Sequence, residues 1–447
     1  MERDNSFFRT VCAVAVPVSL QSMLQSSFGI VDQIMIGQLG SVSVAGVGLA
    51  GKFSSVFSVL VSAVGAVAGI MIAQYLGQKN RKEVERSFLV NLAVSLALAA
   101  LFTVFCLLFP GKIMGVYTRD GRTLEAASDY LFRISGTFLP LAGATMLAAL
   151  FRCMERASIP LFASLASAVF NTVFNYILIF GKCGFTPMGT AGAATATVLA
   201  QIINFLIMAV FFVREMKRNR GTVSRKSSHA VEGFGWHQYG CMLLPVFVCE
   251  MMWSIGENIY AGIYGRLGTE QMAAMTLINP VQGLMIGALC GLSQAAGVLI
   301  GKRLGSGQYD EAYEESKKLI FWGLAGSICL SGIILLLRSP YVAIYQVEEE
   351  VKLLTKQILI SYAVIAPVKV LNMILGGGII RSGGKTGYIM VIDLIGTWLF
   401  GVPLGMLAAF VLRLSIPYVY LILSLEECVR LAISVAVFRR KGWMRRL

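Results

Sequence analysis

The sequence predicts an all-α integral membrane protein with twelve transmembrane helices, arranged as two six-helix bundles related by a pseudo-two-fold axis along the membrane normal. Three observations support this fold class. The 447 residues are 56% hydrophobic and only 14% charged, whereas roughly a quarter of the residues of a soluble domain are charged. Apolar stretches long enough to cross a bilayer recur from Val11 to Phe438. The second half of the chain also repeats the pattern of the first.

The apolar stretches have the length of membrane-spanning helices. About 20 apolar residues cross the hydrocarbon core as a helix, and the ~10-residue alternation of an outer-membrane barrel is missing here. We place the spans at 11–36, 46–75, 87–110, 128–152, 161–180, 188–213, 240–264, 274–301, 317–338, 357–380, 388–412 and 415–438. The first stretch continues past Gly29 to Ile36, too far for a signal peptide, so we interpret it as an uncleaved span.

Basic residues are distributed unequally between the two sides of the membrane. An even number of spans places both termini on one side, and the tails and connections there hold 25 Lys and Arg residues against nine on the other side. The positive-inside rule makes the more basic side cytoplasmic. We therefore expect a multi-pass protein of the inner (cell) membrane with both termini in the cytoplasm.

The longest polar connection, 214–239, is also the most basic. We interpret it as a cytoplasmic linker between an N-terminal bundle, 1–213, and a C-terminal bundle, 240–447. Its basic residues suit an anionic lipid leaflet. The net charge of +14 therefore requires no nucleic-acid partner, and the lipid bilayer is the expected partner of this surface.

An internal repeat relates the two halves. A shift of 228 positions superposes Pro17–Gly77 on Pro245–Gly305 without a gap, and 14 of 61 positions are identical. Many matches fall at glycine-containing turns, such as Gly37–Gly40 with Gly265–Gly268. Because each half has an even number of spans, the two halves have the same orientation, and substrate sites in such folds lie between the halves near the midplane.

Polar and charged residues within the spans are the candidate functional residues, because a charge at the bilayer centre costs about 2.5–3.5 kcal/mol on insertion scales. Helical spacing gathers several of them on one face of span 1 and on the repeat-equivalent face of span 7. These residues are Ser22, Gln25, Asp32 and Gln33, and Glu250, Ser254 and Glu257. Small residues also serve close helix packing, but that explanation does not account for the acids. Two equivalent polar faces predict a shared central cavity.

Further candidates lie in other spans. Asn171 and Asn175 are one helical turn apart and can present amide oxygens to a cation or form hydrogen bonds between helices. We assign cation coupling to Asp32, Asn171, Asn175, Glu250, Glu257 and Asp393, with Asp32 as the ligand if the ion is Na⁺. We assign the substrate cavity to Ser22, Gln25, Gln33, Lys52, Ser254, Tyr260, Asn279, Gln282 and Lys369. The two lysines have an alternative role as counter-charges for nearby acids.

Several segments resemble the multidrug and toxic compound extrusion (MATE) transporters of prokaryotic type. They are VDQIMIGQLG at Val31, AQYLGQKN at Ala73, NTVFNYILIFG at Asn171, TAGAATATVLAQ at Thr190, and the second-half segments PVQGL, GKRLGSGQ and IRSGGKT. The resemblance covers nearly the whole chain. Each motif is moderately specific, and their order together with the 228-residue repeat makes the match strong.

The resemblance implies two six-helix bundles arranged as a V, a central cavity, and export of cationic or amphipathic organic compounds coupled to inward flow of Na⁺ or H⁺. It also implies that Asp32 is the first-span acid that couples the cation and that Asn171 is the family's span-5 asparagine. The chain departs from the family at three positions: Asn175 stands where many members have Asp, Trp253 where one branch has Glu, and Lys385 where some relatives carry an acid. No cofactor other than the coupling ion is implied. We expect a functional monomer.

Two other functions are alternatives to drug transport. A lipid-linked oligosaccharide flippase of the same broad superfamily would need cavity-lining Lys or Arg to hold pyrophosphate, a role open to Lys52 and Lys369. The second alternative is a membrane enzyme or receptor without transport. An enzyme would need a nucleophile with its base, or a metal cluster, and the spans contain neither pattern. The sequence therefore predicts a non-enzymatic secondary transporter that works by alternating access between two bundles.

Overall fold

The computed structural model describes residues 2–218, 235–345 and 347–447, and these residues contain helices and no strand. Eleven helical segments among them are long and apolar enough to cross a membrane. Each of the eleven coincides with one of the first eleven predicted spans. The prediction of an all-α membrane protein is confirmed.

The described residues form two compact units. Unit 1 comprises Met1–Ser19, Ala73–Asn80 and Gly235–Leu447, and unit 2 comprises Leu20–Ile72 and Arg81–Phe234, in each case for the described residues only. Most of the predicted N-terminal bundle therefore lies in unit 2. The start of α1 (Glu2–Gly37) and the end of α2 (Ser41–Gly77) group with the predicted C-terminal bundle in unit 1. Of the predicted linker, residues 219–234 lie outside the described residues.

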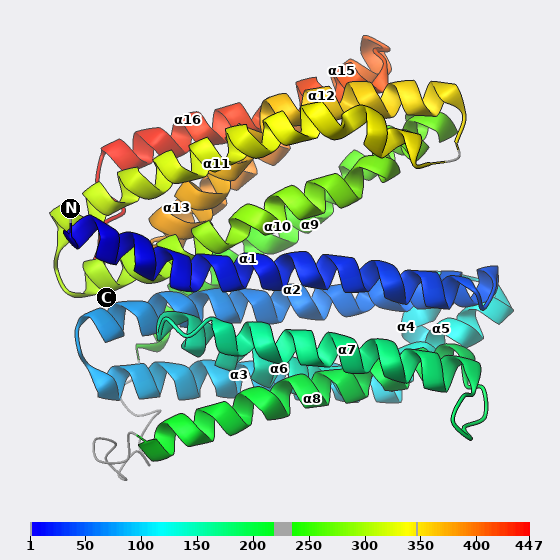
Figure 1. Cartoon of the computed structure of the whole chain (residues 1–447), viewed down its shortest axis with the longest axis horizontal. Coiled ribbons are helices and arrows are strands. Elements are labelled where there is room, and N and C mark those ends of the chain that lie inside the picture. Colours follow the sequence, from blue (N-terminus) through cyan, green and yellow to red (C-terminus); the bar gives the residue numbers. More distant parts are fainter. Residues whose placement is uncertain (1, 219–234, 346) are drawn as a thin grey trace. The chain divides into compact units, whose positions relative to one another are not determined.

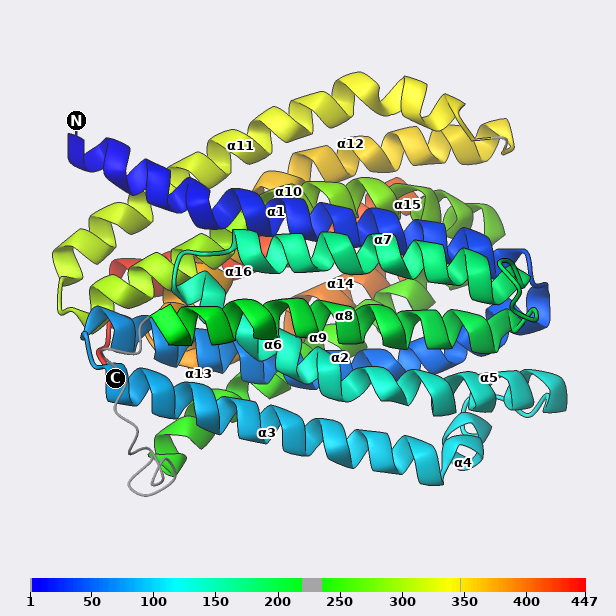
Figure 2. The same ribbon diagram turned by 60° about the horizontal axis from the view of Figure 1, so that its bottom comes forward.

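Unit 2 is a bundle of long helices that run side by side (Figures 1 and 2). Besides its parts of α1 and α2, it contains α3 (Arg81–Leu108), α4 (Pro110–Gly115), α5 (Gly121–Ile134), the 3-10 turn η1 (Ser135–Thr137), α6 (Phe138–Cys153), α7 (Ser158–Phe180) and α8 (Gly189–Arg218). The ring centroids of the buried Phe57 and Phe138 lie 4.5 Å apart in its core. The most extensive packing in this unit joins α7 to α8, which matters for the candidate site.

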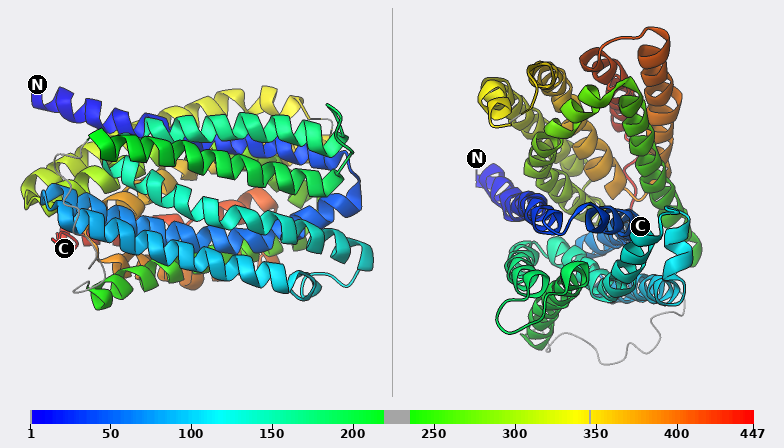
Figure 3. Two further views of the ribbon diagram at one scale, coloured as in Figure 1. Left: turned by 90° about the horizontal axis from the view of Figure 1, so that it is seen from below. Right: turned by 90° about the vertical axis from the view of Figure 1, so that its right-hand side faces the viewer.

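Unit 1 contains the remaining helices, which are drawn from light green to red (Figure 3). They are α9 (Trp236–Leu267), α10 (Thr269–Gly305), α11 (Tyr309–Ala343), α12 (Glu349–Asn372), α13 (Thr386–Asp393), α14 (Val402–Met406), α15 (Ile416–Leu423) and α16 (Glu426–Arg439). Three π-helical segments continue these helices: η2 (Met373–Ile380), η3 (Leu394–Gly401) and η4 (Leu407–Val411). π-Helical turns are rare and occur frequently at functional sites.

The twelfth predicted span, 415–438, differs from the expectation of one continuous helix. The chain forms α15, a turn at Ser424 and Leu425, and then α16. The interruption places Glu426 and Glu427 in the first turn of the new helix. Negative charges are favourable there because they interact with the positive end of the helix dipole.

The crossing of α2 and α10 within unit 1 shows the two-fold relation that the sequence repeat predicts. Gly77 lies against the backbone of Lys302, and Gly305 lies against the backbone of Gln74, so that a Cβ atom at either glycine would collide with a carbonyl group. The 228-residue shift exchanges these two contacts, which is the mark of a self-complementary pairing. Both glycines are therefore required for close approach of the helices.

Gln74 holds three backbone groups in the interior of unit 1. Its Nε2 donates to the carbonyls of Ser382 (2.7 Å) and Arg445 (3.2 Å), and its Oε1 accepts from the amide of Leu447 (2.8 Å). The side chain is fully buried. Because a buried polar group without a partner costs free energy, this single amide joins α2 to two other segments of the unit.

We expect Gln74→Leu to lower the apparent melting temperature of the detergent-purified protein by about 5–10 °C, since each orphaned buried group costs about 1–3 kcal/mol. Fluorescence-detected size-exclusion after heating measures it. Gln25→Leu is the matched control, because the exposed Gln25 has no such role. Equal melting temperatures for Gln74→Leu and Gln25→Leu would show that these hydrogen bonds contribute little.

Candidate functional site

In unit 2 the structure brings together Asp32 of α1, two asparagines of α7 and one threonine of α8. Asn175 Nδ2 donates to Asp32 Oδ1 and to Asn171 Oδ1 (3.2 Å). Asn171 Nδ2 in turn donates to Thr197 Oγ1 (3.3 Å). We call these four residues the Asp32 group. It contains three of the six residues predicted to couple a cation, whereas Thr197 was not among the predictions.

Local packing of α7 on α8 positions this group. Gly192, in the first turn of α8, lies against the backbone of Leu178, where a Cβ atom would come within 2.7 Å of the carbonyl oxygen. Only glycine permits that approach. Asn171 and Asn175 are one turn apart on α7, so both face the same neighbours, and Thr197 reaches Asn171 from the closely packed α8.

The Asp32 group has more oxygen acceptors than donors to satisfy them. Asn175 is 1% exposed, and its Oδ1 has no hydrogen-bond partner among the described residues. No basic side chain in the described part of the chain forms an ion pair with the half-buried Asp32. A carboxylate, amide oxygens and a hydroxyl are hard ligands of the kind that alkali cations prefer. The residues present therefore fit a bound monovalent cation.

The other predicted residues of unit 2 do not join the Asp32 group. Ser22 is half-buried, and Gln25, Gln33 and Lys52 are exposed. Within the described residues, their side chains make no recorded hydrogen bond or ion pair. The main chain of Lys52 accepts a hydrogen bond from Ser55 Oγ (2.6 Å), which is a local helix contact.

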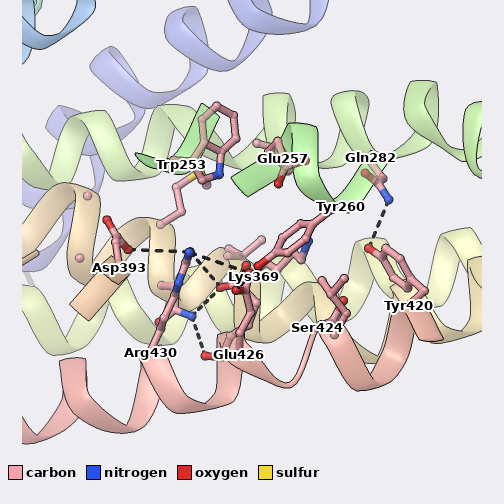
Figure 4. A pocket seen from close by; sticks show the side chains of 18 of the residues that line it. Trp253, Glu257, Tyr260, Gln282, Lys369, Asp393, Tyr420, Ser424, Glu426 and Arg430 are labelled. Atoms are coloured by element: carbon pink, nitrogen blue, oxygen red, sulfur yellow. Dashed lines mark hydrogen bonds and ion pairs between the residues drawn. The ribbon is translucent and has the colours of Figure 1, made fainter. Parts of the chain in front are cut away.

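In unit 1, residues of α9, α10, α12, η2, α13, α15 and α16 line a cavity of about 550 Å³ (Figure 4). Six predicted residues line it: Glu257, Tyr260, Asn279, Gln282, Lys369 and Asp393. Two others from the same prediction lie elsewhere. Glu250 forms an ion pair with the cavity residue Arg381 at 3.5 Å, and the Ser254 carbonyl accepts from Asn258 Nδ2 at 2.7 Å.

Arg430 is the central charge of this cavity. Its guanidinium lies 3.8 Å from Asp393, 3.9 Å from Glu426 and 3.9 Å from Glu427, and it donates to the hydroxyl of Thr397. Arg430 is 8% exposed, and the two glutamates are similarly buried. One base therefore serves three carboxylates from α13 and α16, as Figure 4 shows in part.

Each of the three carboxylates also accepts a hydrogen bond from a neutral side chain. The hydroxyl of Tyr260 donates to Glu426 Oε2, Asn372 Nδ2 donates to Glu427 Oε2 (2.9 Å), and the thiol of Cys249 donates to Asp393. Hydrogen bonds to charged groups are worth about 1.5–3 kcal/mol. The three acids and Arg430, of which only Asp393 is half-buried and the others are buried, therefore form one network, which we call the Arg430 network.

Glycines on the π-helical segment η3 make room for this network. A Cβ atom at Gly396 would collide with the side chain of Arg430, and one at Gly401 would collide with Glu426 and the hydroxyl of Tyr260. The segment after Asp393 thus passes close to α16 because two of its residues lack side chains. Because Gly396 and Gly401 leave this space free, the Arg430 guanidinium can lie between the acids.

Glu426, Glu427 and Arg430 are not among the site residues that the sequence predicted. The available signal was the spacing of two acids and an arginine three and four residues apart in an apolar span. The repeat offers a second signal. The 228-residue shift pairs Asp32 with Tyr260, and both residues carry a polar group into the site of their own unit.

Among the described residues, no group of three or more His, Cys, Asp or Glu side chains is placed so that it could hold a metal ion. The donors of the Asp32 group are oxygens from amides, a hydroxyl and one carboxylate. Such donors favour hard cations over zinc or copper.

Comparison with known proteins finds the MatE family model matching residues 17–177 and again 245–407. The chain is 24% identical to the probable multidrug resistance protein NorM of Thermotoga maritima, covering 97% of this chain and 92% of that protein. It is also 24% identical to the human multidrug and toxin extrusion protein 2, covering 97% and 77% of the two chains. The solved outward-facing structure of a MATE family multidrug resistance transporter of the MOP superfamily superposes with a TM-score of 0.87 at 17% identity, over 96% of this chain and 95% of that one.

We expect Arg430→Met to destabilise unit 1 strongly, because it leaves two buried carboxylates and the half-buried carboxylate of Asp393 without their base. Removing one partner of a buried ion pair costs about 3–5 kcal/mol, so the apparent melting temperature in detergent is expected to fall by about 5–15 °C. Arg440→Met, at an exposed position after α16, is the control. A melting temperature for Arg430→Met within 1–2 °C, roughly, of the control would mean that the acids are compensated without Arg430.

Proposed function

This chain belongs to the MatE family of membrane transporters, and from this premise we propose that it exports cationic or amphipathic organic compounds by antiport with Na⁺ or H⁺. The family model matches both halves of the repeat, and relatives carry names of multidrug resistance and toxin extrusion proteins. The observation that carries the coupling proposal is the Asp32 group. Among the described residues, its carboxylate has no basic partner, and the neighbouring buried Asn175 Oδ1 accepts no hydrogen bond.

The Asp32 group supports coupling because its charge can change. Na⁺ would take oxygens from Asp32, Asn175 and Thr197, while a proton would need only the carboxylate. In either case the ion neutralises a charge that costs free energy at bilayer depth. The orientation of the transporter that leaves Asp32 neutral is then favoured, which is the differential affinity that antiport requires.

We propose alternating access between the two halves as the transport cycle, with the chain acting as a monomer. The distribution of Lys and Arg supports a multi-pass arrangement in the inner membrane with cytoplasmic termini. The residues Ser22, Gln25 and Gln33 would face substrate from unit 2 in this scheme, because they share a helix face with Asp32. The exposure of Gln25 and Gln33 and the half-burial of Ser22 in unit 2 are compatible with that role.

A flippase for lipid-linked oligosaccharides is not favoured by the charges of unit 1. The cavity there has four acidic and three basic lining side chains. Arg381 and Arg430 are engaged by Glu250 and by the acids of the Arg430 network. A pyrophosphate group would meet more carboxylates than free basic groups, and Coulomb repulsion in a partly buried site would oppose its binding.

Transport in proteoliposomes tests the proposed coupling. Liposomes are loaded with Na⁺, or separately made acidic inside, and ethidium uptake is followed after dilution. We expect uptake by the wild-type protein with at least one gradient and a loss of more than about tenfold for Asp32→Asn, because the amide can neither bind a proton nor offer a full charge to Na⁺.

Asp129→Asn is the matched control, since Asp129 is a half-exposed acid of the same unit that pairs with Arg133 at 3.1 Å. It should retain uptake. If Asp32→Asn transported normally under both gradients, the assignment of coupling to Asp32 would be wrong. If the wild-type protein moved no ethidium under either gradient, the proposed transport of organic cations would fail.

A further inference from the structure

Two lysines of unit 1 converge on the ring of Tyr313, which lies near the start of α11. Lys317 Nζ is 5.0 Å and Lys441 Nζ is 4.5 Å from the centroid of this ring. Tyr313 is half-buried, and its hydroxyl makes no recorded hydrogen bond within the described chain, so it can serve as a further donor. Two ammonium groups at one ring repel each other. An anion bound between them would remove that repulsion.

The acids of α11 do not neutralise both lysines. Glu314 Oε1 pairs with Lys317 Nζ at 2.7 Å, and both side chains are exposed. Two further acids of this helix pair with Arg303 of α10, at 3.0 and 2.7 Å. No ion pair in the described chain joins Asp310, the remaining acid at the start of α11, to either lysine. Lys441 therefore keeps a charge that no carboxylate of the described residues compensates.

The backbone holds Lys441 in place. Residues 440–447 follow α16, and we call them the 440–447 segment. The amide of Lys441 donates to the Phe438 carbonyl, and the Lys441 carbonyl accepts from the amide of Met444, both at 3.1 Å. Trp443 is fully buried, and its Nε1 donates to the Phe438 carbonyl at 3.2 Å. The Phe438 ring stacks on Tyr313 with centroids 4.7 Å apart. Because Lys441 is fixed beside α11, an anion would lose little free energy in ordering it.

Two sequence motifs anchor the 440–447 segment, and the proposed transport cycle uses neither of these contacts. In IRSGGKT, a Cβ atom at Gly383 would come within 1.9 Å of the Trp443 carbonyl oxygen, so glycine is required there. In AQYLGQKN, Gln78 Nε2 donates to the Leu447 carbonyl at 2.9 Å, and Gln74 Oε1 accepts from the Leu447 amide at 2.8 Å. The segment is thus a fixed part of unit 1.

Both lysines lie where an apolar helix meets polar chain. The predicted spans 317–338 and 415–438 place Lys317 and Lys441 at the boundary of the apolar region. Phe321 follows Lys317 by one helical turn and is 67% exposed, so the helix face next to the ammonium is apolar. In a bilayer that face contacts acyl chains, while a lysine at a helix end extends its ammonium to the headgroups. A phosphate linked to acyl chains fits this surface better than a soluble anion does.

We propose that this surface binds an anionic phospholipid, with the phosphate between Lys317 and Lys441 and an acyl chain along Phe321. The proposal does not rest on the proposed transport function. Three exposed arginines of the 440–447 segment add to the attraction: Arg440, Arg445 and Arg446. Phosphatidylcholine carries a choline cation next to its phosphate, and the same basic groups repel that cation. The site therefore selects phospholipids by headgroup charge.

Native mass spectrometry of the full-length purified protein tests this selection. The delipidated protein is titrated with phosphatidylglycerol and, separately, with phosphatidylcholine of the same acyl chains. The first phosphatidylglycerol is expected to bind at least about tenfold more tightly, because each lysine beside an anionic headgroup contributes about fivefold. Equal affinities for the two lipids would overturn the proposal without the use of any variant.

Variants locate the site. Lys317→Gln and Lys441→Gln should each weaken the first phosphatidylglycerol by about fivefold, and the double variant should lose the preference while its binding of phosphatidylcholine stays unchanged. Lys82→Gln is the matched control, because Lys82 is exposed at the start of α3, which the 228-residue shift pairs with the start of α11. It should keep the full preference. A double variant that still preferred phosphatidylglycerol would place the lipid elsewhere, and the proposal would fail.

Inorganic phosphate distinguishes a lipid site from a site for soluble anions. It carries the charge without acyl chains, so a thousandfold excess over phosphatidylglycerol should leave the bound lipid in place. Displacement of phosphatidylglycerol by an equal concentration of inorganic phosphate would show that the lysines hold a soluble anion, and the lipid proposal would be overturned.

Discussion

The constraint on which this structure depends is that a charge held at bilayer depth has to be compensated. The protein meets it in two ways. In the Arg430 network, three carboxylates share one guanidinium and three neutral donors, all inside unit 1. In the Asp32 group, the carboxylate accepts a hydrogen bond from one amide and has no basic partner within the described part of the chain. The first arrangement is complete without a ligand, whereas the second leaves charge for an ion to neutralise.

Backbone geometry allows these charges to sit where they do. The glycines of η3 admit Arg430 and Glu426 at close range, and Gly192 brings α8 against α7 so that Thr197 reaches Asn171. Glycine also sets the crossing of α2 and α10, where two repeat-related contacts exchange under the 228-residue shift. In each case a glycine on one helix allows a neighbouring helix to come close or to place a polar side chain against it.

Much of the fold could be predicted from the sequence, because apolar length and glycine punctuation act locally along the chain. The sequence predicted that Asp32 and Asn175 are polar residues within spans. It could not predict that they contact each other, because that depends on how α1 packs against α7 and not on residue spacing. The Arg430 network was missed for a similar reason. Glu426 and Glu427 follow a break in the twelfth span, and their partners Asn372 and Tyr260 come from helices distant in sequence. The predicted grouping of Glu250 with Glu257 did not anticipate that Arg381 engages only the former.

The most direct test of the account is the apparent melting temperature of Asp32→Asn in sodium-free detergent solution. If Asp32 is an uncompensated charge kept for function, its neutral replacement should melt at the wild-type temperature or a few degrees above it, because functional groups are often retained at a cost in stability. A fall of about 5 °C or more would show instead that the Asp32 carboxylate stabilises the fold through its hydrogen bonds. That result would contradict the claim that Asp32 is an uncompensated charge kept for function.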